Sequence, residues 1–374
     1  MSTNPPVPSI NPFIFKGQEI VAEFCQSYGD KLKTLYKERE DEMQKLVAIR
    51  DIVRSTLLEI GWIRTAERGV EQSLYALDGA YALNHKDAFT ELALVAMSGE
   101  QTQGLRGEAD LLHLQHTPNV EMVAAAIMSL MEIQQTLWLG SYVKNLSPSS
   151  FVLMDGGRYS TWIHLKQLMS LVEDDPTLHA TLSKTPYWTT LGKESSVEYL
   201  MNNRIVGLQK LVSSQTLAKL VTKLIPDVQL DCYNDKVLVN VLMEPNEVMI
   251  IPMEPKSSDN TFISGLTHEA FKQCSVFSPD NAVLTSCYAK VGPNSTVLKL
   301  EVHKSLIDEG GLPDLLSTLE AQVTTGLQEP YINWVIDKLC KESVKIGKVT
   351  LQNTLYGNLN DSVIHEILNH GYRT

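Results

Sequence analysis

Residues 150–160 have the sequence SFVLMDGGRYS, in which an apolar run ends at an Asp-Gly-Gly turn. The residues from Phe151 to Met154 are all apolar, a pattern that indicates a buried strand. The segment STWIHLKQLMSLVED at 160–174 then has the apolar spacing of a helix. In α/β sheets built from such units, functional groups collect at the carboxyl ends of the strands. The sequence therefore predicts an α/β domain with Asp155 at a strand end.

A second Asp-Gly pair lies upstream, where Asp78 interrupts the β-compatible run SLYALDGAYAL at 73–83. Between the two pairs, residues 120–139 read VEMVAAAIMSLMEIQQTLWL, which is apolar nearly all round and predicts a buried helix. Glu132 lies deep in this helix. Three acidic residues are thus expected within or at the end of apolar elements.

Acidic residues in such places call for a compensating charge. Burying an unpaired carboxylate costs on the order of several kcal/mol unless a cation or hydrogen-bond donors compensate. Converging carboxylates also repel one another, so a shared divalent cation would account for Asp78, Glu132 and Asp155 together. Mg²⁺ and Mn²⁺ prefer oxygen ligands, and a pair of such ions can clamp the attacking and leaving oxygens in phosphoryl transfer. We therefore predict that these three residues are metal ligands.

Each of these residues also has a purely structural interpretation. An Asp-Gly pair after a strand is most often a turn, and a Glu in an apolar helix can pair with a buried Arg or Lys. The order of two Asp-Gly pairs separated by a buried helix with a central Glu is more specific than any single member.

The rest of the chain predicts further helices and strands. A long amphipathic helix is expected from about residue 18 to residue 60, either packed on its own domain or in an oligomer contact. The remaining expectations are a strand at 89–99, a polar loop at 99–119, helix at 195–225, strands within 228–243, 247–253, 282–291 and 296–303, and helices at 312–326 and 330–347.

Composition excludes several classes of protein. The 374 residues carry a net charge of -12, so a generic basic coat for nucleic acid is absent, although a metal or a basic partner can supply positive charge. The start of the chain does not resemble a signal peptide, and no stretch is apolar enough to span a bilayer, so a cytoplasmic protein without a membrane contact is expected. An odd number of scattered cysteines argues against a disulfide framework or a zinc knuckle. These cysteines are Cys25, Cys232, Cys274, Cys287 and Cys340.

Three motifs occur in the order LDGAYA (77–82), MEIQQTLW (131–138) and VLMDGGRYS (152–160). They resemble the motifs of the NurA family of nucleases, which act with HerA-type translocases. The resemblance implies an RNase H-like core, a mixed sheet flanked by helices, over residues 70–374. Residues 1–69 are then an N-terminal leader and long helix available for dimer or partner contacts. It also implies that Asp78, Glu132 and Asp155 are catalytic residues that ligate Mn²⁺ or Mg²⁺.

Two further segments extend the resemblance. SCYAKVGPNSTVLKLEV (286–302) is similar to a Tyr-containing strand hairpin of the family, and EPYINWVIDKLCKESVKIG (329–347) is similar to a helix followed by a Lys-Ile strand. The metal-binding His of the family falls at Asp337. Asp337 is a substitute ligand, the mark of a degenerate site, or a surface residue paired with Lys338 or Lys341.

Two basic residues are weaker candidates. Lys184, in LSKTPYW (182–188), resembles a family Lys that follows the second strand, and a cation there would stabilise phosphate charge. A solvated lysine is the alternative. Arg158 either contacts a phosphate oxygen or makes a salt bridge across the Asp-Gly-Gly turn.

The expected function is a Mn²⁺- or Mg²⁺-dependent deoxyribonuclease that hydrolyses phosphodiester bonds. The resemblance implies that it works as a homodimer with a HerA-like hexameric ATPase, in DNA end processing or anti-phage defence. The alternative is a catalytically degenerate NurA-like adaptor that binds a translocase without cleaving DNA.

Overall fold

The computed structural model describes residues 12–86, 89–100, 104–115, 119–146, 150–191, 202–209, 215–228, 230, 233–251, 284–293, 295–323 and 329–358. The chain divides into two compact units, residues 1–56 and 57–374. The described part of the first unit is helical and belongs to α1 (Pro12–Glu59), whose last residues belong to the second unit. The long N-terminal helix expected from the sequence is thus confirmed, whereas residues 1–11 of the leader lie outside the described residues.

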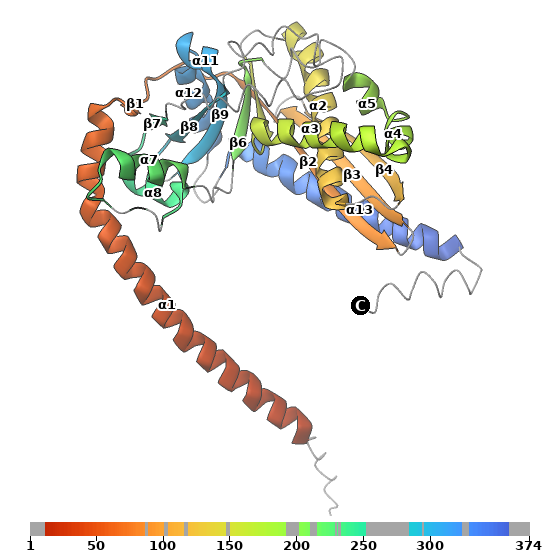
Figure 1. Cartoon of the computed structure of the whole chain (residues 1–374), viewed down its shortest axis with the longest axis horizontal. Coiled ribbons are helices and arrows are strands. Elements are labelled where there is room, and N and C mark those ends of the chain that lie inside the picture. The colour runs from red at the N-terminus through yellow and green to blue at the C-terminus, as the bar shows by residue number, and fades with distance from the viewer. Residues whose placement is uncertain are drawn as a thin grey trace, which may run out of the picture. The chain divides into compact units, whose positions relative to one another are not determined.

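The second unit alternates strands and helices (Figure 1). Its strands are β1 (Ile63–Thr65), β2 (Ser73–Lys86), β3 (Phe89–Glu100), β4 (Gly104–Gln115), β5 (Ser150–Asp155), β6 (Ile205–Gln209), β7 (Glu247–Ile250), β8 (Leu284–Lys290) and β9 (Leu298–His303). Its helices are α2 (Val120–Leu146), α3 (Arg158–Asp174), α4 (Pro176–Leu182), α5 (Pro186–Leu191), α7 (Thr216–Leu224), α8 (Asp235–Leu242), α11 (Lys304–Asp308), α12 (Leu312–Gln322) and α13 (Tyr331–Asn358). No helix among the described residues has both the length and the apolar character needed to cross a membrane.

In the described part of the chain, the strands form one mixed sheet of nine strands in the order β1-β7-β8-β9-β6-β5-β2-β3-β4. β2, β3 and β4 form an antiparallel meander. β5 pairs in parallel with β2, and β6 pairs in parallel with β5. β6, β9, β8, β7 and β1 then pair antiparallel in succession. Because β1 pairs with β7, residues 63–65 are part of the sheet, although they precede the expected domain boundary at residue 69.

Helices cover both faces of the sheet, because successive side chains of a strand point to opposite faces. On β3, Leu92 and Leu94 are buried against α2 and α3, whereas Val95 belongs to the cluster that includes α12 and α13. Figure 1 shows α2 and α3 in front of β2 and β3, with α13 behind them. The centre of the sheet is therefore shielded from water on both sides.

Two expectations about the first half of the sheet are wrong. β2 continues through Asp78 and Gly79, which were expected to interrupt it, because β3 pairs with it from Ala76 to Lys86. Residues 104–115, expected within a loop, form β4. Near its end Leu112 and Leu114 are buried and the residues between and before them are exposed, which is the period-two pattern of a half-buried strand.

Three expectations about the second half also need correction. Residues 205–209, expected to be helical, form β6, whose apolar residues are buried between β5 and β9. Residues 236–242, expected to be a strand, lie in α8, which starts where the Asn234 side chain accepts a hydrogen bond from the Val237 N–H. The Lys-Ile segment at 345–346 stays within α13 and does not begin a strand.

Candidate metal centre

The parallel pairing of β2 with β5 brings the two Asp-Gly motifs together. The paired residues run from Ser73 opposite Ser150 to Leu77 opposite Met154. Asp78 and Asp155 are the next residues on the two strands, so the register places them side by side. Both follow residues of the same face by two positions, namely Ala76 and Leu153 in the core on the α13 side.

Helix α13 supplies the third carboxylate. Its buried stripe contains Asn333, Asp337, Cys340 and Val344, which follow one another at spacings of three and four residues. Asp78, Asp155 and Asp337 each offer one carboxylate oxygen, and these three oxygens all lie within 4.8 Å of one another. Three acidic side chains from two strands and one helix therefore meet at one point.

Glu132 approaches from α2, which packs on the other face of the sheet. Gly79 makes this approach possible: a Cβ atom at Gly79 would lie 2.9 Å from the Glu132 Oε1 and 2.8 Å from the Met128 Cγ. Glu132 itself is only 5% exposed. It lies outside the group of three, yet close enough that the charge of Asp155 affects it.

Burial and charge together alter the protonation of this glutamate. Burial raises the pKa of Glu132 to about 8, with the Asp155 carboxylate adding to the rise and a hydrogen bond from the Gly79 backbone opposing it. The carboxyl group of Glu132 is therefore largely protonated at neutral pH in the metal-free protein. A divalent cation beside it would favour the ionised form.

The set of donor atoms fits a hard divalent cation. The three clustered donors are carboxylate oxygens, which suit Mg²⁺ and Mn²⁺. The nearby Cys340 donates a hydrogen bond to the Asp78 backbone carbonyl at 3.3 Å. Burial and the surrounding carboxylates raise the pKa of the Cys340 thiol far above its usual range, which disfavours a thiolate ligand. The site thus resembles an oxygen-ligand centre more than a zinc site.

Asp337 combines features of two of the interpretations given to it from the sequence. It is 5% exposed and lies among the other carboxylates, so it is not a surface residue. Its Oδ1 is also 2.6 Å from the Nζ of Lys341, one turn further along α13. The Lys341 side chain is 57% exposed. The ammonium group of Lys341 is therefore a largely exposed positive charge next to the cluster. In the sequence, the spacing of four residues along a helix is the signal for this pair.

The other two basic candidates lie elsewhere. Arg158 is buried and its Nη1 donates a hydrogen bond to the Ile205 carbonyl of β6 at 2.8 Å. Burial lowers the pKa of Arg158 to about 10, and the charge of Glu301 acts in the opposite direction. Arg158 thus anchors the turn after Asp155 to the sheet, and its burial gives no support to the phosphate contact considered from the sequence. Lys184 is exposed between α4 and α5, and no ion pair involving it occurs among the described residues.

The chain is similar to known proteins in its three-dimensional structure and not in its sequence. The chain matches no protein-family model and no curated protein sequence. It is similar to the NurA nuclease from Sulfolobus solfataricus, with 10% identity, a TM-score of 0.50, and coverage of 86% of this chain and 96% of that one. A NurA structure bound to dAMP and manganese gives a TM-score of 0.54 at 11% identity over 88% and 98% of the two chains. A NurA structure with manganese gives 0.53 at 12% identity over the same shares.

The chain has the NurA fold. The resemblance stated from the three short motifs is therefore confirmed at the level of the fold, including its RNase H-like core. The five strands β4-β3-β2-β5-β6 form that core. β2 is the central strand: it begins the antiparallel meander β2-β3-β4, and on its other side β5 pairs in parallel with it and β6 pairs in parallel with β5. In this NurA-like arrangement Asp78 and Asp155 occupy the two adjacent central strands.

Proposed function

We propose that this protein is a NurA-like deoxyribonuclease that depends on Mn²⁺ or Mg²⁺. The observation that carries the proposal is the cluster of Asp78, Asp155 and Asp337 on two central strands and helix α13 of a NurA fold. One carboxylate oxygen from each residue lies within 4.8 Å of the other two. A fold alone does not specify an activity, but a shared oxygen site of this kind supports phosphodiester hydrolysis.

The four acidic residues of the site would have different roles, according to where they lie. Asp78, Asp155 and Asp337 would hold the cation, with Glu132 completing the site from α2. When bound, the cation would neutralise charge on the phosphodiester and lower the pKa of an attacking water. With the cation bound, Glu132 would be ionised and could accept a proton from that water, whereas its pKa of about 8 keeps it largely protonated in the metal-free protein.

Two lysines are candidates for a further charge at the phosphate. Lys341 is exposed and next to the cluster, so it could turn from Asp337 toward a substrate phosphate when a cation takes its place. Lys184 remains a catalytic candidate on the resemblance alone. A loss of activity in Lys341→Met that Lys184→Met does not share would assign this role to Lys341.

The proposal includes partners. A chain with a net charge of -12 can neutralise few phosphates, so we infer that it works on DNA held by another machine. On the resemblance, that machine is a HerA-like hexameric ATPase and the nuclease is a homodimer, acting in DNA end processing or anti-phage defence. The ATPase partner, the homodimer and the cellular role are proposals that the fold alone does not establish.

The test is degradation of linear DNA by the purified chain, with Mn²⁺ or with a chelator, alone and with a candidate ATPase. We expect cleavage only with the metal, and a loss of at least about 100-fold in Asp155→Asn, which keeps the shape of the ligand but removes its charge. The exposed Asp308, changed to Asn, serves as the matched control. Binding of the ATPase without any cleavage by the wild type would instead favour the adaptor.

A further inference from the structure

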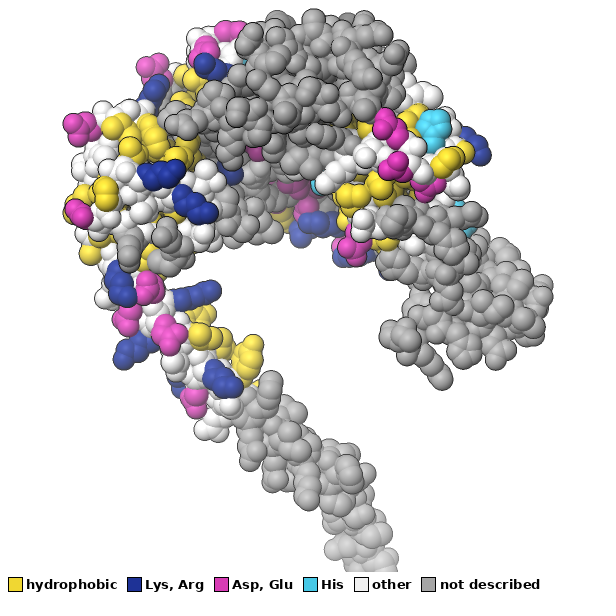
Figure 2. Space-filling model, viewed as in Figure 1, with side chains coloured by type: hydrophobic (Ala, Val, Ile, Leu, Met, Phe, Trp, Pro, Cys, Tyr) yellow, Lys and Arg dark blue, Asp and Glu magenta, His cyan; other side chains and the backbone are white. Residues whose placement is uncertain are grey.

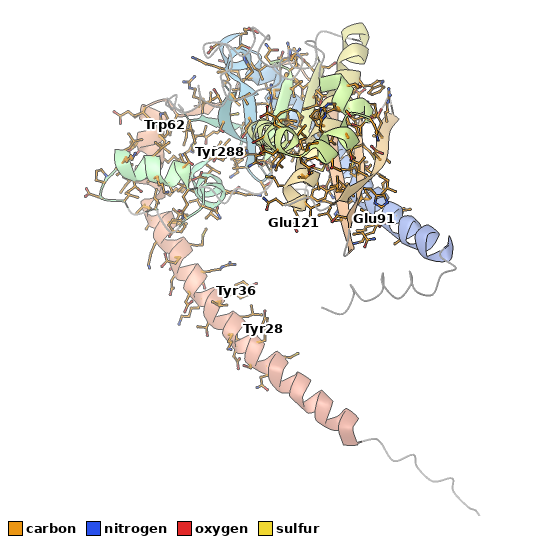
Figure 3. The ribbon with its side chains drawn as sticks, turned by 45° about the vertical axis from the view of Figure 1, so that its right-hand side comes forward. Tyr28, Tyr36, Trp62, Glu91, Glu121 and Tyr288 are labelled. Atoms are coloured by element: carbon orange, nitrogen blue, oxygen red, sulfur yellow. The ribbon has the colours of Figure 1, made fainter. Side chains whose placement is uncertain are left out.

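Helix α1 carries large apolar side chains that are exposed to solvent. The exposed fractions are 57% for Tyr28, 41% for Leu32, 54% for Leu35, 69% for Tyr36 and 39% for Met43. Figure 2 shows hydrophobic side chains gathered along one side of this helix, and Figure 3 shows Tyr28 and Tyr36 projecting from that side. A contiguous apolar surface of this kind usually marks an interaction site.

The spacing of these residues fits a second helix. Leu32, Tyr36 and Met43 follow one another at four and seven residues, with Arg39 on the same stripe. This alternation of three and four residues is the seam along which two helices pack. Because the stripe is narrow, it fits the side of one partner helix better than a broad, flat surface.

The charges along the same segment are strongly ordered. Lys31, Lys33 and Lys37 precede the acidic run of Glu38, Glu40, Asp41 and Glu42. Two ion pairs within the helix, Lys33 with Asp30 at 3.3 Å and Lys45 with Glu42 at 2.6 Å, are well exposed. Such pairs are weak, so both charge blocks remain available to an external partner.

This charge order selects the partner and its direction. In a parallel pair of identical helices in register, Lys33 would lie at the same level as Lys33 of the partner, and Glu40 and Glu42 at the same level as their own counterparts. In an antiparallel pair centred between residues 37 and 38, Lys33 flanks the apolar stripe and lies near Glu40 and Glu42, which flank the same stripe on the other helix. A two-fold axis generates this arrangement from identical chains, because residue i contacts residue j and residue j contacts residue i.

We propose that α1 pairs antiparallel with α1 of a second copy of this chain through residues 32–43. In that register Leu32 packs against the partner's Met43, and Tyr36 packs against the partner's Arg39. A guanidinium over a tyrosine ring is favourable, which accounts for a charged residue on an otherwise apolar stripe. The pairing gives the homodimer of the proposed function a defined contact, and it does not depend on nuclease activity.

Disulfide cross-linking of the full chain tests the direction of the pair. Cys25 is exposed and free, so Cys25→Ser is the parent. We expect a mixture of the Tyr36→Cys and Arg39→Cys variants to form the mixed disulfide dimer in preference to either self-linked dimer. Efficient self-linking of Tyr36→Cys would indicate a parallel pair, and a monomeric parent without any cross-link would exclude the contact. Both outcomes overturn the proposal.

Charge reversal tests the contribution of the two blocks to the dimer dissociation constant, measured by sedimentation. Changing Lys31, Lys33 and Lys37 to Glu should weaken the dimer by about tenfold or more, because like charges then face each other. Adding Glu38→Lys, Glu40→Lys and Glu42→Lys restores the opposed blocks and should return the affinity to within about threefold of the parent. The matched control reverses three exposed lysines outside α1. These are Lys219, Lys223 and Lys304.

A dissociation constant that the first reversal leaves unchanged, or that the second does not restore, would contradict the antiparallel pairing. Circular dichroism of each variant verifies that α1 stays helical. Because both experiments measure assembly and not DNA cleavage, failure of this inference and failure of the proposed nuclease activity are distinguishable.

Discussion

Gly79 is the residue through which both faces of the sheet contribute to one site. It follows Asp78 on β2, so its missing side chain would point to the opposite face, toward α2. A Cβ there would lie 2.8 Å from Met128 and 2.9 Å from Glu132. The Asp-Gly pair is therefore not a turn at this position: Asp78 contributes a carboxylate to the cluster on one side, and Gly79 leaves room for Glu132 on the other.

We expect Gly79→Ala to displace Glu132, to weaken Mn²⁺ binding, and to destabilise the protein by about 1–3 kcal/mol as overpacking does. Calorimetry with Mn²⁺ and chemical denaturation measure the two effects. Gly347→Ala is the control, because nothing lies within 4 Å of a Cβ at that helical position. Ala there should leave Mn²⁺ binding unchanged and stabilise α13 slightly. Equal behaviour of the two variants would show that Gly79 has no special role.

The protonation of Glu132 predicts a pH dependence of stability without metal. Its pKa is about 8 in the folded protein and 4.5 for a freely solvated glutamate, so between these values the folded chain binds a proton that the unfolded chain releases. Stability must therefore fall as pH rises through this window, with a slope approaching about 1.4 kcal/mol per pH unit from this group. We expect the free energy of unfolding of the wild type, relative to Glu132→Gln, to decline from pH 5 to pH 8. A constant difference would contradict the buried, proton-binding state of Glu132.

At the scale of elements, the sequence predicted those parts of the site that local patterns specify. Asp155 was predictable because an apolar run ends at it, and Glu132 because a charge is rare in a helix that is apolar all round. β6 was missed because its five residues follow the polar segment 202–204 and are recognisable as a strand only through their pairing with β5 and β9. The position of Asp337 beside Asp78 is likewise a long-range contact, which no local periodicity encodes.

The contact between α13 and the sheet also gives a prediction about Lys341. Since its Nζ lies 2.6 Å from Asp337, a cation entering the cluster must compete with it. We expect Lys341→Met to bind Mn²⁺ about threefold or more tightly than the wild type and to melt at a lower temperature without metal. Lys345→Met is the control, since Lys345 pairs 2.6 Å from the exposed Glu342 on the same helix. An unchanged Mn²⁺ affinity in Lys341→Met would contradict the competition.

At the scale of the whole molecule, the net charge bears on the proposed binding of DNA. A charge of -12 leaves little gain from counterion release, so DNA binding by the chain alone should be weak and should weaken further with salt. We expect a HerA-like ATPase to co-purify with the chain and to stimulate DNA degradation when ATP is present. Deletion of residues 1–12 tests whether the leader contributes to this assembly. Full activity of the monomer, without any gain from the ATPase, would show that the inferred partnership is mistaken.

The most direct test of the central claim is a calorimetric titration of the full chain with Mn²⁺. The claim is that Asp78, Asp155 and Asp337 together hold a divalent cation. We predict binding of one or two ions by the wild type, loss of at least about tenfold in affinity when any one of the three is changed to Asn, and no change in Asp308→Asn. Mn²⁺ binding that survives all three substitutions, or that is absent from the wild type, would contradict the account.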